Sequence, residues 1–390
     1  MNNKKWNRIL SYVLVSLLSI VITVAVMLGI FLFHRQGQSK LVSLEQLITD
    51  CFIGEVDRTA MEDAAAHAMI QALGDRWSYY IPAKDYQAHL EQVKNAYVGI
   101  GISISSKAGD EGVKVVSVTA DGPADKAGMQ VGDLIIGVDG KNVIGMDLDA
   151  VKKLVQGEEN TSVSITVSRD GAEQTLSVTR ARIQTVVVKS QMLEGNIGLI
   201  SIANFNENSA NQTIAAINAL IEQGAVRLIF DVRNNPGGYA SEMVRILDRL
   251  LPEGKLFTYV DYTGEEKTDM SDATCINLPM AVLINSDSYS AAEFFAAAMW
   301  EYDAAVVVGE KTVGKGYFQI TYEFSDGSAV GLSVGKYYTP KGNSLADVGI
   351  TPDVPATLTE EQVLQLLAGQ LLPEEDPQIQ TAIQAVMSQS

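Results

Sequence analysis

The sequence predicts an α/β catalytic core with a mainly parallel sheet, plus a β-rich module, helical terminal segments and one N-terminal transmembrane helix. Three observations lead to this fold class. Residues 184–355 alternate apolar strands with helices of about 10–15 residues, which is the pattern of βαβ units. Residues 97–183 instead hold short alternating runs separated by Asp-Gly turns. Residues 9–33 contain no charged side chain.

The uncharged stretch 9–33 predicts a membrane anchor. As a helix it would extend about 37 Å, which is enough for a hydrocarbon core of about 30 Å. Lys4, Lys5 and Arg8 precede it and favour a cytoplasmic stub at residues 1–8. A secretory signal would have a shorter apolar core and a small-residue cleavage site. We therefore expect an uncleaved single-pass anchor in the cell membrane, with the catalytic domain extracytoplasmic.

Charge and cysteine content restrict the partners. The formal net charge is −18, and residues 1–35 contribute +4, so the remainder carries −22. Such an acidic chain argues against nucleic acid as a partner, because phosphate binding needs clustered lysine and arginine. Cys51 and Cys275 lie in segments assigned to different domains, and whether they pair stays open. Neither has a nearby histidine cluster, so we predict no metal site and no cofactor.

The terminal segments are predicted to be helical. Within residues 36–96, Leu44, Leu47 and Ile48 show helical spacing, and Pro82 opens a further helix. Residues 356–390 contain two short helical patterns. We favour a packing or oligomerisation role for these ends.

The core elements follow from apolar runs and helical periodicity. The expected strands and helices of residues 184–355 are, in order, Ile197–Ile202, Ser209–Gln223, Arg227–Val232, Ala240–Leu251, Ala281–Ile284, Ala291–Trp300 and Ala304–Val308. In the β-rich module one amphipathic helix fits Asp147–Val155.

Ser290 is the candidate nucleophile, because it follows a predicted strand and opens a predicted helix. Open α/β sheets bind ligands at that edge. A structural explanation competes: Ser290 and Glu293 form an S-x-x-E capping box, in which the hydroxyl only satisfies helix amides. Ser288 on the same loop competes for the nucleophile role.

Lys315 is the candidate general base, because all three histidines lie in the first 89 residues, far from Ser290 in sequence. A lysine base must be neutral near pH 7, and burial among apolar residues such as Val308 and Val313 would lower its pKa. A solvent-exposed lysine in a glycine-rich hairpin is the alternative. The G-x-x-x-x-G-K pattern of 309–315 also begins like a P-loop, but Gly316 offers no hydroxyl for Mg²⁺ and a strand follows.

Two further groups complete the predicted site. Gln319 lies two strand steps after Lys315 and could orient its amine without adding charge. The run 234–238, Asn-Asn-Pro-Gly-Gly, ends a buried strand and opens a helix. It is either an ordinary turn or an oxyanion hole built from backbone amides.

Three motifs in this order resemble the bacterial C-terminal processing (tail-specific) peptidases. The motifs are 231–238 (DVRNNPGG), 288–293 (SYSAAE) and 309–316 (GEKTVGKG). The segments 74–80 and 349–353 resemble the family's pre-PDZ segment and closing motif. The resemblance implies that Ser290 is the nucleophile, Lys315 the base and Gln319 its orienting residue, with amides of Gly237 or Gly238 and Ala291 as oxyanion hole. Tyr289 and Ala292 depart from the family's usual small residue and serine.

Residues 97–183 resemble a PDZ domain through 97–102 (YVGIGI) and 122–133. Such a domain adds a peptide as an extra strand and captures its carboxylate on loop amides. The loop would comprise Val98, Gly99, Ile100 and Gly101. A β domain without a ligand is the alternative.

The sequence thus predicts a membrane-anchored serine endopeptidase that cleaves C-terminal regions or unfolded proteins outside the membrane. Its PDZ domain would bind substrate tails and could gate activity, and the family resemblance suggests a homo-oligomer, a dimer or a higher assembly, formed through the helical ends. The competing hypothesis is a catalytically silent PDZ adaptor that retains the peptidase fold as a scaffold.

Overall fold

The computed structural model describes residues 6, 12–14, 16–27, 39–106 and 112–389, in two compact units, 1–72 and 73–390. In the first unit, α2 (Lys40–Cys51) and α3 (Arg58–Gln71) begin at side-chain caps, Ser39 and Asp57. No helix within the described ranges is long and apolar enough to cross a bilayer. Of the predicted anchor 9–33, residues 9–11, 15 and 28–33 lie outside those ranges.

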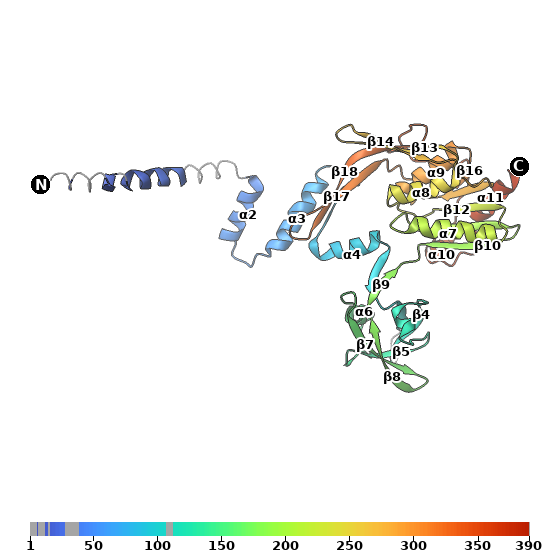
Figure 1. The fold of residues 1–390 in the computed structure, drawn as a ribbon, viewed down its shortest axis with the longest axis horizontal. Coiled ribbons are helices and arrows are strands. Elements are labelled where there is room, and N and C mark those ends of the chain that lie inside the picture. Colours follow the sequence, from blue (N-terminus) through green and yellow to red (C-terminus); the bar gives the residue numbers. More distant parts are fainter. Residues whose placement is uncertain (1–5, 7–11, 15, 28–38, 107–111, 390) are drawn as a thin grey trace. The chain divides into compact units, whose positions relative to one another are not determined.

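A six-stranded sheet forms the core of the second unit (Figure 1). Its order is β10 (Val188–Leu193), β11 (Ile197–Ile202), β12 (Arg227–Asp231), β15 (Met280–Ile284), β16 (Ala305–Gly309) and β19 (Val354–Pro355). Only β10 is antiparallel to its neighbour. The central strands β11, β12 and β15 are mostly apolar and buried, as expected for strands covered by helices on both faces. The mainly parallel sheet predicted from the alternation is confirmed.

Helices pack on both faces of this sheet. One face carries α7 (Ser209–Glu222), α8 (Ala240–Leu250) and α9 (Ala291–Glu301), and α11 (Pro377–Ser388) packs against the other. On the first face the Phe295 ring of α9 meets Phe230 of β12 edge-on, with centroids 5.6 Å apart. The predicted core elements agree with the observed bounds to within one or two residues.

A second sheet is antiparallel, and its strands are interspersed along the chain with those of the core sheet. It comprises β1 (Tyr79–Ile81), β13 (Gly254–Asp261), β14 (Glu266–Ser271), β17 (Tyr317–Glu323) and β18 (Ala329–Tyr338). The prediction that residues 36–96 are helical is wrong at β1, which pairs with residues 329–331 of β18. Three residues are too few to show a strand period. The helix expected after Pro82 is present as α4 (Ala83–Val93).

The β-rich module has its own sheet and its own core. Strands β2 (Ala96–Gly99) and β9 (Ala181–Gln184) pair where the chain enters and leaves it. Between them the chain forms α5 (Pro123–Lys126), α6 (Leu148–Val155) and a sheet of β3 (Ile102–Ser105), β4 (Val113–Val118), β5 (Leu134–Val138), β6 (Lys141–Asn142), β7 (Ser162–Arg169) and β8 (Ala172–Thr179). Buried Val115, Ile135 and Ile165 belong to a cluster separate from the catalytic core.

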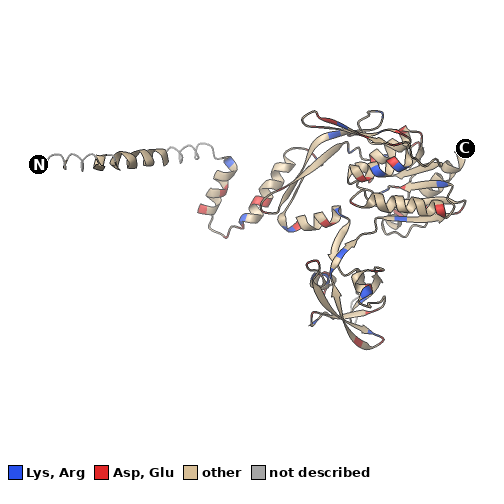
Figure 2. Cartoon of the chain, viewed as in Figure 1, with Lys and Arg blue, Asp and Glu red and all other residues tan. Residues whose placement is uncertain are grey.

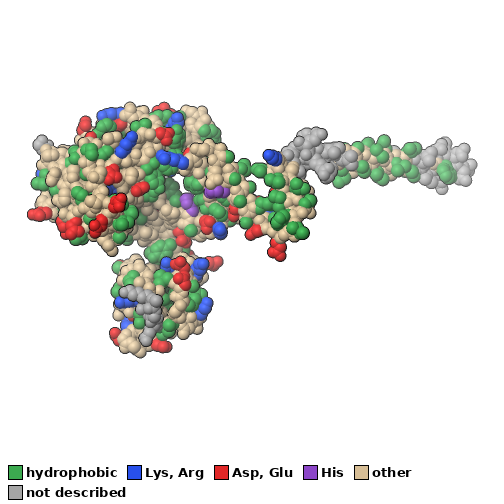
Figure 3. All heavy atoms as spheres, turned by 180° about the vertical axis from the view of Figure 1, so that it is seen from behind, with side chains coloured by type: hydrophobic (Ala, Val, Ile, Leu, Met, Phe, Trp, Pro, Cys, Tyr) green, Lys and Arg blue, Asp and Glu red, His purple; other side chains and the backbone are tan. Residues whose placement is uncertain are grey.

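The surface carries mixed charge. Lysine and arginine are scattered over many elements (Figure 2), and acidic side chains recur over the face drawn in Figure 3. Both cysteines are free thiols; Cys51 is exposed and Cys275 half-buried.

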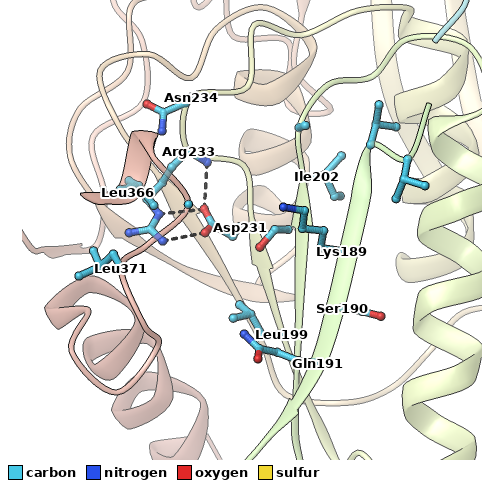
Figure 4. Close-up of a pocket in the computed structure, with 15 residues that line it drawn as sticks. Lys189, Ser190, Gln191, Leu199, Ile202, Asp231, Arg233, Asn234, Leu366 and Leu371 are labelled. Carbon is cyan, nitrogen blue, oxygen red and sulfur yellow. Dashed lines mark hydrogen bonds and ion pairs between the residues drawn. The ribbon is translucent and has the colours of Figure 1, made fainter. Parts of the chain in front are cut away.

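A buried ion cluster fixes the C-terminal helix to the core sheet. Arg233, directly after β12, donates to Asp231 at 2.7 Å and to Asp376 at 2.8 Å, and it also donates to Gln378 at 2.8 Å. Asp376 caps α11. The Arg233–Asp231 pair borders a hollow of about 470 Å³ that also includes Leu366 and Leu371 (Figure 4). Leu366 ends α10 (Glu360–Leu367).

We predict that Asp376→Asn lowers the free energy of unfolding by about 3 kcal/mol. Asparagine can still cap α11, but it leaves Arg233 with one anionic partner fewer in a buried site. Urea denaturation would measure the loss. The exposed neighbour Glu374 is the control, because Glu374→Gln should change stability by less than about 0.5 kcal/mol. Equal effects of both substitutions would contradict the assigned role of the cluster.

Candidate active site

The three sequence motifs meet at one edge of the core sheet. They follow β12, β15 and β16, which are parallel neighbours, so their carboxyl ends lie side by side. A cavity of about 500 Å³ at this edge is lined by Ser290, Lys315 and Gln319, together with residues of β1 and α4. The structure thus brings the predicted nucleophile, base and orienting amide into one cavity. The hollow of Figure 4 contains none of these three residues.

Ser290 sits on a sharp turn between β15 and α9. Its backbone has φ 59° and ψ −126°, a conformation that residues other than glycine rarely adopt. Strain of this kind costs on the order of 1–3 kcal/mol and clusters at functional sites. The same strand–turn–helix arrangement exposes the serine of nucleophile elbows. The carboxylate half of the predicted capping box is also present, because Ser290 N–H donates to Glu293 Oε2 at 2.9 Å.

Ser288 has a structural task. Its hydroxyl donates to the Val232 carbonyl at 2.7 Å and accepts from the Asn285 N–H at 3.0 Å, and the residue is fully buried. It therefore ties the β15 turn to the end of β12. These bonds give the Ser288 hydroxyl a structural role, and the assignment of Ser290 as the nucleophile stays a prediction.

Glu293 joins the serine turn to the lysine loop. This fully buried carboxylate accepts from Ser290 N–H, and on the other side from Thr312 Oγ1 at 2.5 Å, Gly314 N–H at 2.7 Å and Lys315 N–H at 2.8 Å. A buried carboxylate is stable only when it is hydrogen-bonded. Sequence reasoning assigned Glu293 only to the cap and missed its contacts with the loop, which lies 19–22 residues further on.

The Lys315 amine lies in an aromatic setting. Its Nζ is 5.0 Å from the Trp77 ring centroid and 5.9 Å from that of Tyr289. Burial lowers the pKa of Lys315 from 10.5 to about 8, against the opposing effect of the Asp75 and Glu293 carboxylates. Val308 and Val313, which were expected to be its apolar walls, are not among the residues that line the cavity. Trp77 was visible in the 74–80 motif but had no assigned contact.

Gln319 lines the cavity, although the regular strand used to place it is interrupted. Strand β17 begins after Lys315, at Tyr317, and its register shifts between Phe318 and Gln319. The Gln319 amide donates to Ser333 Oγ at 2.9 Å and to the Tyr317 carbonyl at 3.3 Å. Its role toward Lys315 stays a prediction.

The glycine turn after β12 contacts Ser290 closely. A Cβ on Gly237 would lie 2.8 Å from Ser290 Cβ, and Gly237 has φ 88°. The Gly237 N–H already donates to Asn235 Oδ1 at 2.8 Å. Tyr289 N–H donates to the Asn235 carbonyl at 3.1 Å and fixes the two turns together. Of the predicted oxyanion-hole amides, Gly238 and Ala291 therefore remain available for a ligand.

His89 lies in the same cavity as Ser290 and Lys315. Its distance along the sequence had removed it from consideration, but β1 and α4 return to the core and bring it there. The ring is stacked with Tyr86 at 6.2 Å and also meets Tyr79 at 6.0 Å. Burial lowers the pKa of His89 below its usual 6.5, which favours the neutral ring. No cluster of metal-ligating side chains is found in the part of the chain that the structure describes.

The loop 98–101, which was predicted to bind a peptide carboxylate, is partly in a strand and partly in a turn. Val98 and Gly99 belong to β2 and pair with Arg182 and Ala181. Ile100 is buried in the module core, and Gly101 turns the chain with φ 79°. The loop leads into β3, an edge strand of its sheet, which can accept an added peptide strand.

Fold and cavity together are those of a serine hydrolase with a peptide-binding module. Two family models match: "Peptidase family S41" over residues 196–356 and "PDZ domain" over residues 114–169. The chain is 34% identical to the carboxy-terminal processing protease CtpA of Bacillus subtilis, covering 85% of this chain and 72% of that protein. It is 31% identical to a probable CtpA-like serine protease of Staphylococcus epidermidis, covering 93% and 76%.

A solved structure, the photosystem II D1 C-terminal processing protease, is 30% identical, covers 82% of this chain and 87% of its own, and has a TM-score of 0.46. The family assignment rests on the sequence identities to the two proteases and not on this structural match. The chain belongs to peptidase family S41, and it is a serine protease with a PDZ domain that acts on proteins or peptides.

We predict that Lys315→Met stabilises the fold at pH 7 by about 1–3 kcal/mol. A lysine whose pKa falls from 10.5 to about 8 disfavours the folded state below pH 8, because each pKa unit corresponds to about 1.4 kcal/mol. Methionine keeps the apolar stem and removes the amine. Denaturant midpoints should show the gain at pH 7 and its disappearance above pH 10.5. A loss of stability at pH 7 would contradict the burial of the amine.

Proposed function

We propose that the chain is a membrane-anchored endopeptidase with Ser290 as nucleophile and Lys315 as general base. The observation that carries this is the setting of the Lys315 amine: it lies beside the neighbouring Trp77 and Tyr289 rings, and Lys315 lines the cavity that contains Ser290. A lysine with a pKa of about 8 is partly neutral at pH 7 and can take a hydroxyl proton.

The proposed reaction is acyl transfer. Ser290 Oγ attacks the substrate carbonyl while its proton passes to Lys315 Nζ, and the Gly238 and Ala291 amides stabilise the oxyanion. Lys315 then protonates the leaving amine, and the acyl-enzyme ester remains on Ser290. Water attacks this ester with Lys315 again as base. Gln319 would position the amine during these proton transfers, because it lines the same cavity and is neutral.

The PDZ domain is proposed to bind the C-terminal tail of the substrate. Strand β3 offers an open edge, and the preceding Gly101 turn lies where loop amides would meet a carboxylate. The same binding event could gate access to Ser290.

Localisation and assembly are also proposals. The charge-free stretch 9–33 behind Lys4, Lys5 and Arg8 supports an anchor with the protease outside the membrane. Exposed apolar side chains on both terminal helical segments support a homodimer: Leu41, Leu44 and Leu47 of α2, and Val363, Leu364 and Leu367 of α10. The alternative, a silent PDZ adaptor, has no need of a strained serine beside a buried lysine.

We predict that Ser290→Ala and Lys315→Met each lower cleavage by at least about 10³-fold, because each removes one partner of the proton transfer. The assay uses the full chain and an unfolded protein that ends in small apolar residues. The exposed Lys311 lies on the same loop, and Lys311→Met should cleave like wild type. Persistent cleavage in the Ser290 and Lys315 variants would reject the dyad. A large fall in melting temperature for Ser290→Ala would instead favour the capping explanation.

The pH profile should distinguish Lys315 from His89 as the base. Since the base acts in its neutral form, kcat/KM should rise about tenfold per pH unit up to about pH 8 and then level off. A midpoint below 6.5 would assign the base to His89, whose pKa is lowered by burial.

A further inference from the structure

Asp75 precedes β1, and the turn that follows it holds its carboxylate. Its Oδ1 accepts from the Trp77 N–H at 3.0 Å, and its Oδ2 accepts from the Ser78 hydroxyl at 2.6 Å. Burial would raise the pKa of Asp75, but hydrogen bonds from the hydroxyls of Ser333 and Ser78 and from backbone amides lower it. The group is therefore an ionised carboxylate, which accepts hydrogen bonds and donates none.

This carboxylate is connected to Gln319 through two serines. Because the Ser78 hydroxyl donates to Asp75, its oxygen can accept from the Ser333 N–H, at 3.0 Å. The Ser333 hydroxyl also donates to Asp75, so its oxygen accepts from Gln319 Nε2, at 2.9 Å. The anion at one end of this chain thus fixes the direction of every hydrogen bond in it.

The direction of these bonds decides which end of the Gln319 amide is left for another partner. The Nε2 group donates to Ser333 and, at 3.3 Å, to the Tyr317 carbonyl, so both of its hydrogens are used. The carbonyl oxygen Oε1 is the other end. A lysine ammonium donates three hydrogen bonds and accepts none, so Oε1 is the end that can hold the Lys315 amine.

A second connection from Asp75 reaches the lysine through Trp77. The bond from the Trp77 N–H fixes the backbone that carries the indole, and the centroid of that ring lies 5.0 Å from Lys315 Nζ. The charge of Asp75 acts on the same amine. Burial lowers the pKa of Lys315 to about 8, and Asp75 and Glu293 are the carboxylates that oppose this shift.

We propose that Asp75 is a positioning residue that acts on the Lys315 amine through Gln319. It directs the amide so that Oε1 accepts from one N–H of the amine, which leaves the nitrogen lone pair for the Ser290 proton. Asparagine at position 75 could donate as well as accept, so the direction of the chain would no longer be imposed. The inference rests on the proposed Ser290–Lys315 dyad and adds the residue that orients its base.

The titratable groups around Lys315 come from several elements. Asp75 before β1 and Glu293 of α9 are the two carboxylates that raise its pKa. The cavity that Lys315 lines also contains one imidazole and five phenols, namely those of His89, Tyr79, Tyr86, Tyr239, Tyr289 and Tyr337. Asp75→Asn therefore removes one of the two anions that act on the amine.

The test measures cleavage of an unfolded protein by the full chain as a function of pH. Asp75→Asn should lower the plateau of kcat by at least about tenfold and change KM by less than about threefold, because the dyad remains but its base is misoriented. The midpoint of kcat/KM should move to lower pH by about half a unit or more, because an anion that favoured the charged lysine is gone. A purely structural role would lower the melting temperature and leave this midpoint in place.

Ser333→Ala separates the two effects. It removes the hydroxyl between Asp75 and Gln319 but keeps the Asp75 charge, so kcat should fall by at least about fivefold while the midpoint stays at its wild-type value. The double variant should be less than about threefold slower than Asp75→Asn, since both changes break the same chain. Ser333→Ala also tests the chain by itself if Asp75→Asn does not fold.

The control is Asp347→Asn. Asp347 is exposed, lines the same surface hollow as Asp75 and is not among the carboxylates that act on Lys315. Its φ of 59° is one that asparagine tolerates, so this variant should keep the wild-type kcat and midpoint.

Two kinds of failure are distinguishable. Wild-type kcat in Asp75→Asn or Ser333→Ala, additive losses in the double variant, or an unmoved midpoint in Asp75→Asn would overturn the role of Asp75 alone, provided that cleavage still requires Ser290 and Lys315. Cleavage that persists in Ser290→Ala and Lys315→Met would reject the dyad, and the positioning role with it.

Discussion

The active-site geometry depends on one buried carboxylate. Glu293 accepts hydrogen bonds from the serine turn on one side and from three donors of the lysine loop on the other. Withdrawing either segment would leave a fully buried anion with too few partners, so the two segments must close on it together. A loop with glycines at 314 and 316 is thereby tied to the serine turn by hydrogen bonds.

The Glu293 carboxylate also has an electrostatic effect on Lys315 that opposes the lowering of its pKa. As a nearby anion it favours the charged form of Lys315, as does Asp75. Desolvation by the surrounding rings acts in the other direction and is larger, so the pKa falls. Burial of Lys315 therefore outweighs both carboxylates, and the nearby rings include Trp77 from a distant part of the chain.

The sequence was sufficient for everything that depends on local pattern. The alternation of strands and helices predicted the parallel sheet, and three motifs after three parallel strands predicted where the site lies. What it missed depends on the return of residues 75–93 to the core. Nothing in the local sequence assigned a contact to Trp77 or His89. The segment around β1, which pairs with β18, brings Trp77 near the Lys315 amine and His89 into the cavity. A three-residue strand has no periodicity to read.

The hydrogen-bond partners of the site residues could not be predicted from the sequence either. The structural role of Ser288 depends on a hydrogen bond to the Val232 carbonyl, which follows a different strand. Nor could spacing show that the Gly237 N–H donates to the Asn235 side chain. Such choices depend on which donor finds which acceptor across the sheet edge, and spacing along the chain does not encode that.

The paired ribbon β2–β9 has an evolutionary consequence. Ala96 and Gln184 are opposite each other, so about 5 Å separates the two ends of an excursion that folds around its own core. Recombination can therefore remove, acquire or exchange this module. A tight turn can join the two chain ends that remain, and the hydrolase core, whose sequence lies on both sides of the module, retains its sheet. Diversity in tail recognition can thus arise by module exchange, independently of the residues that perform the chemistry.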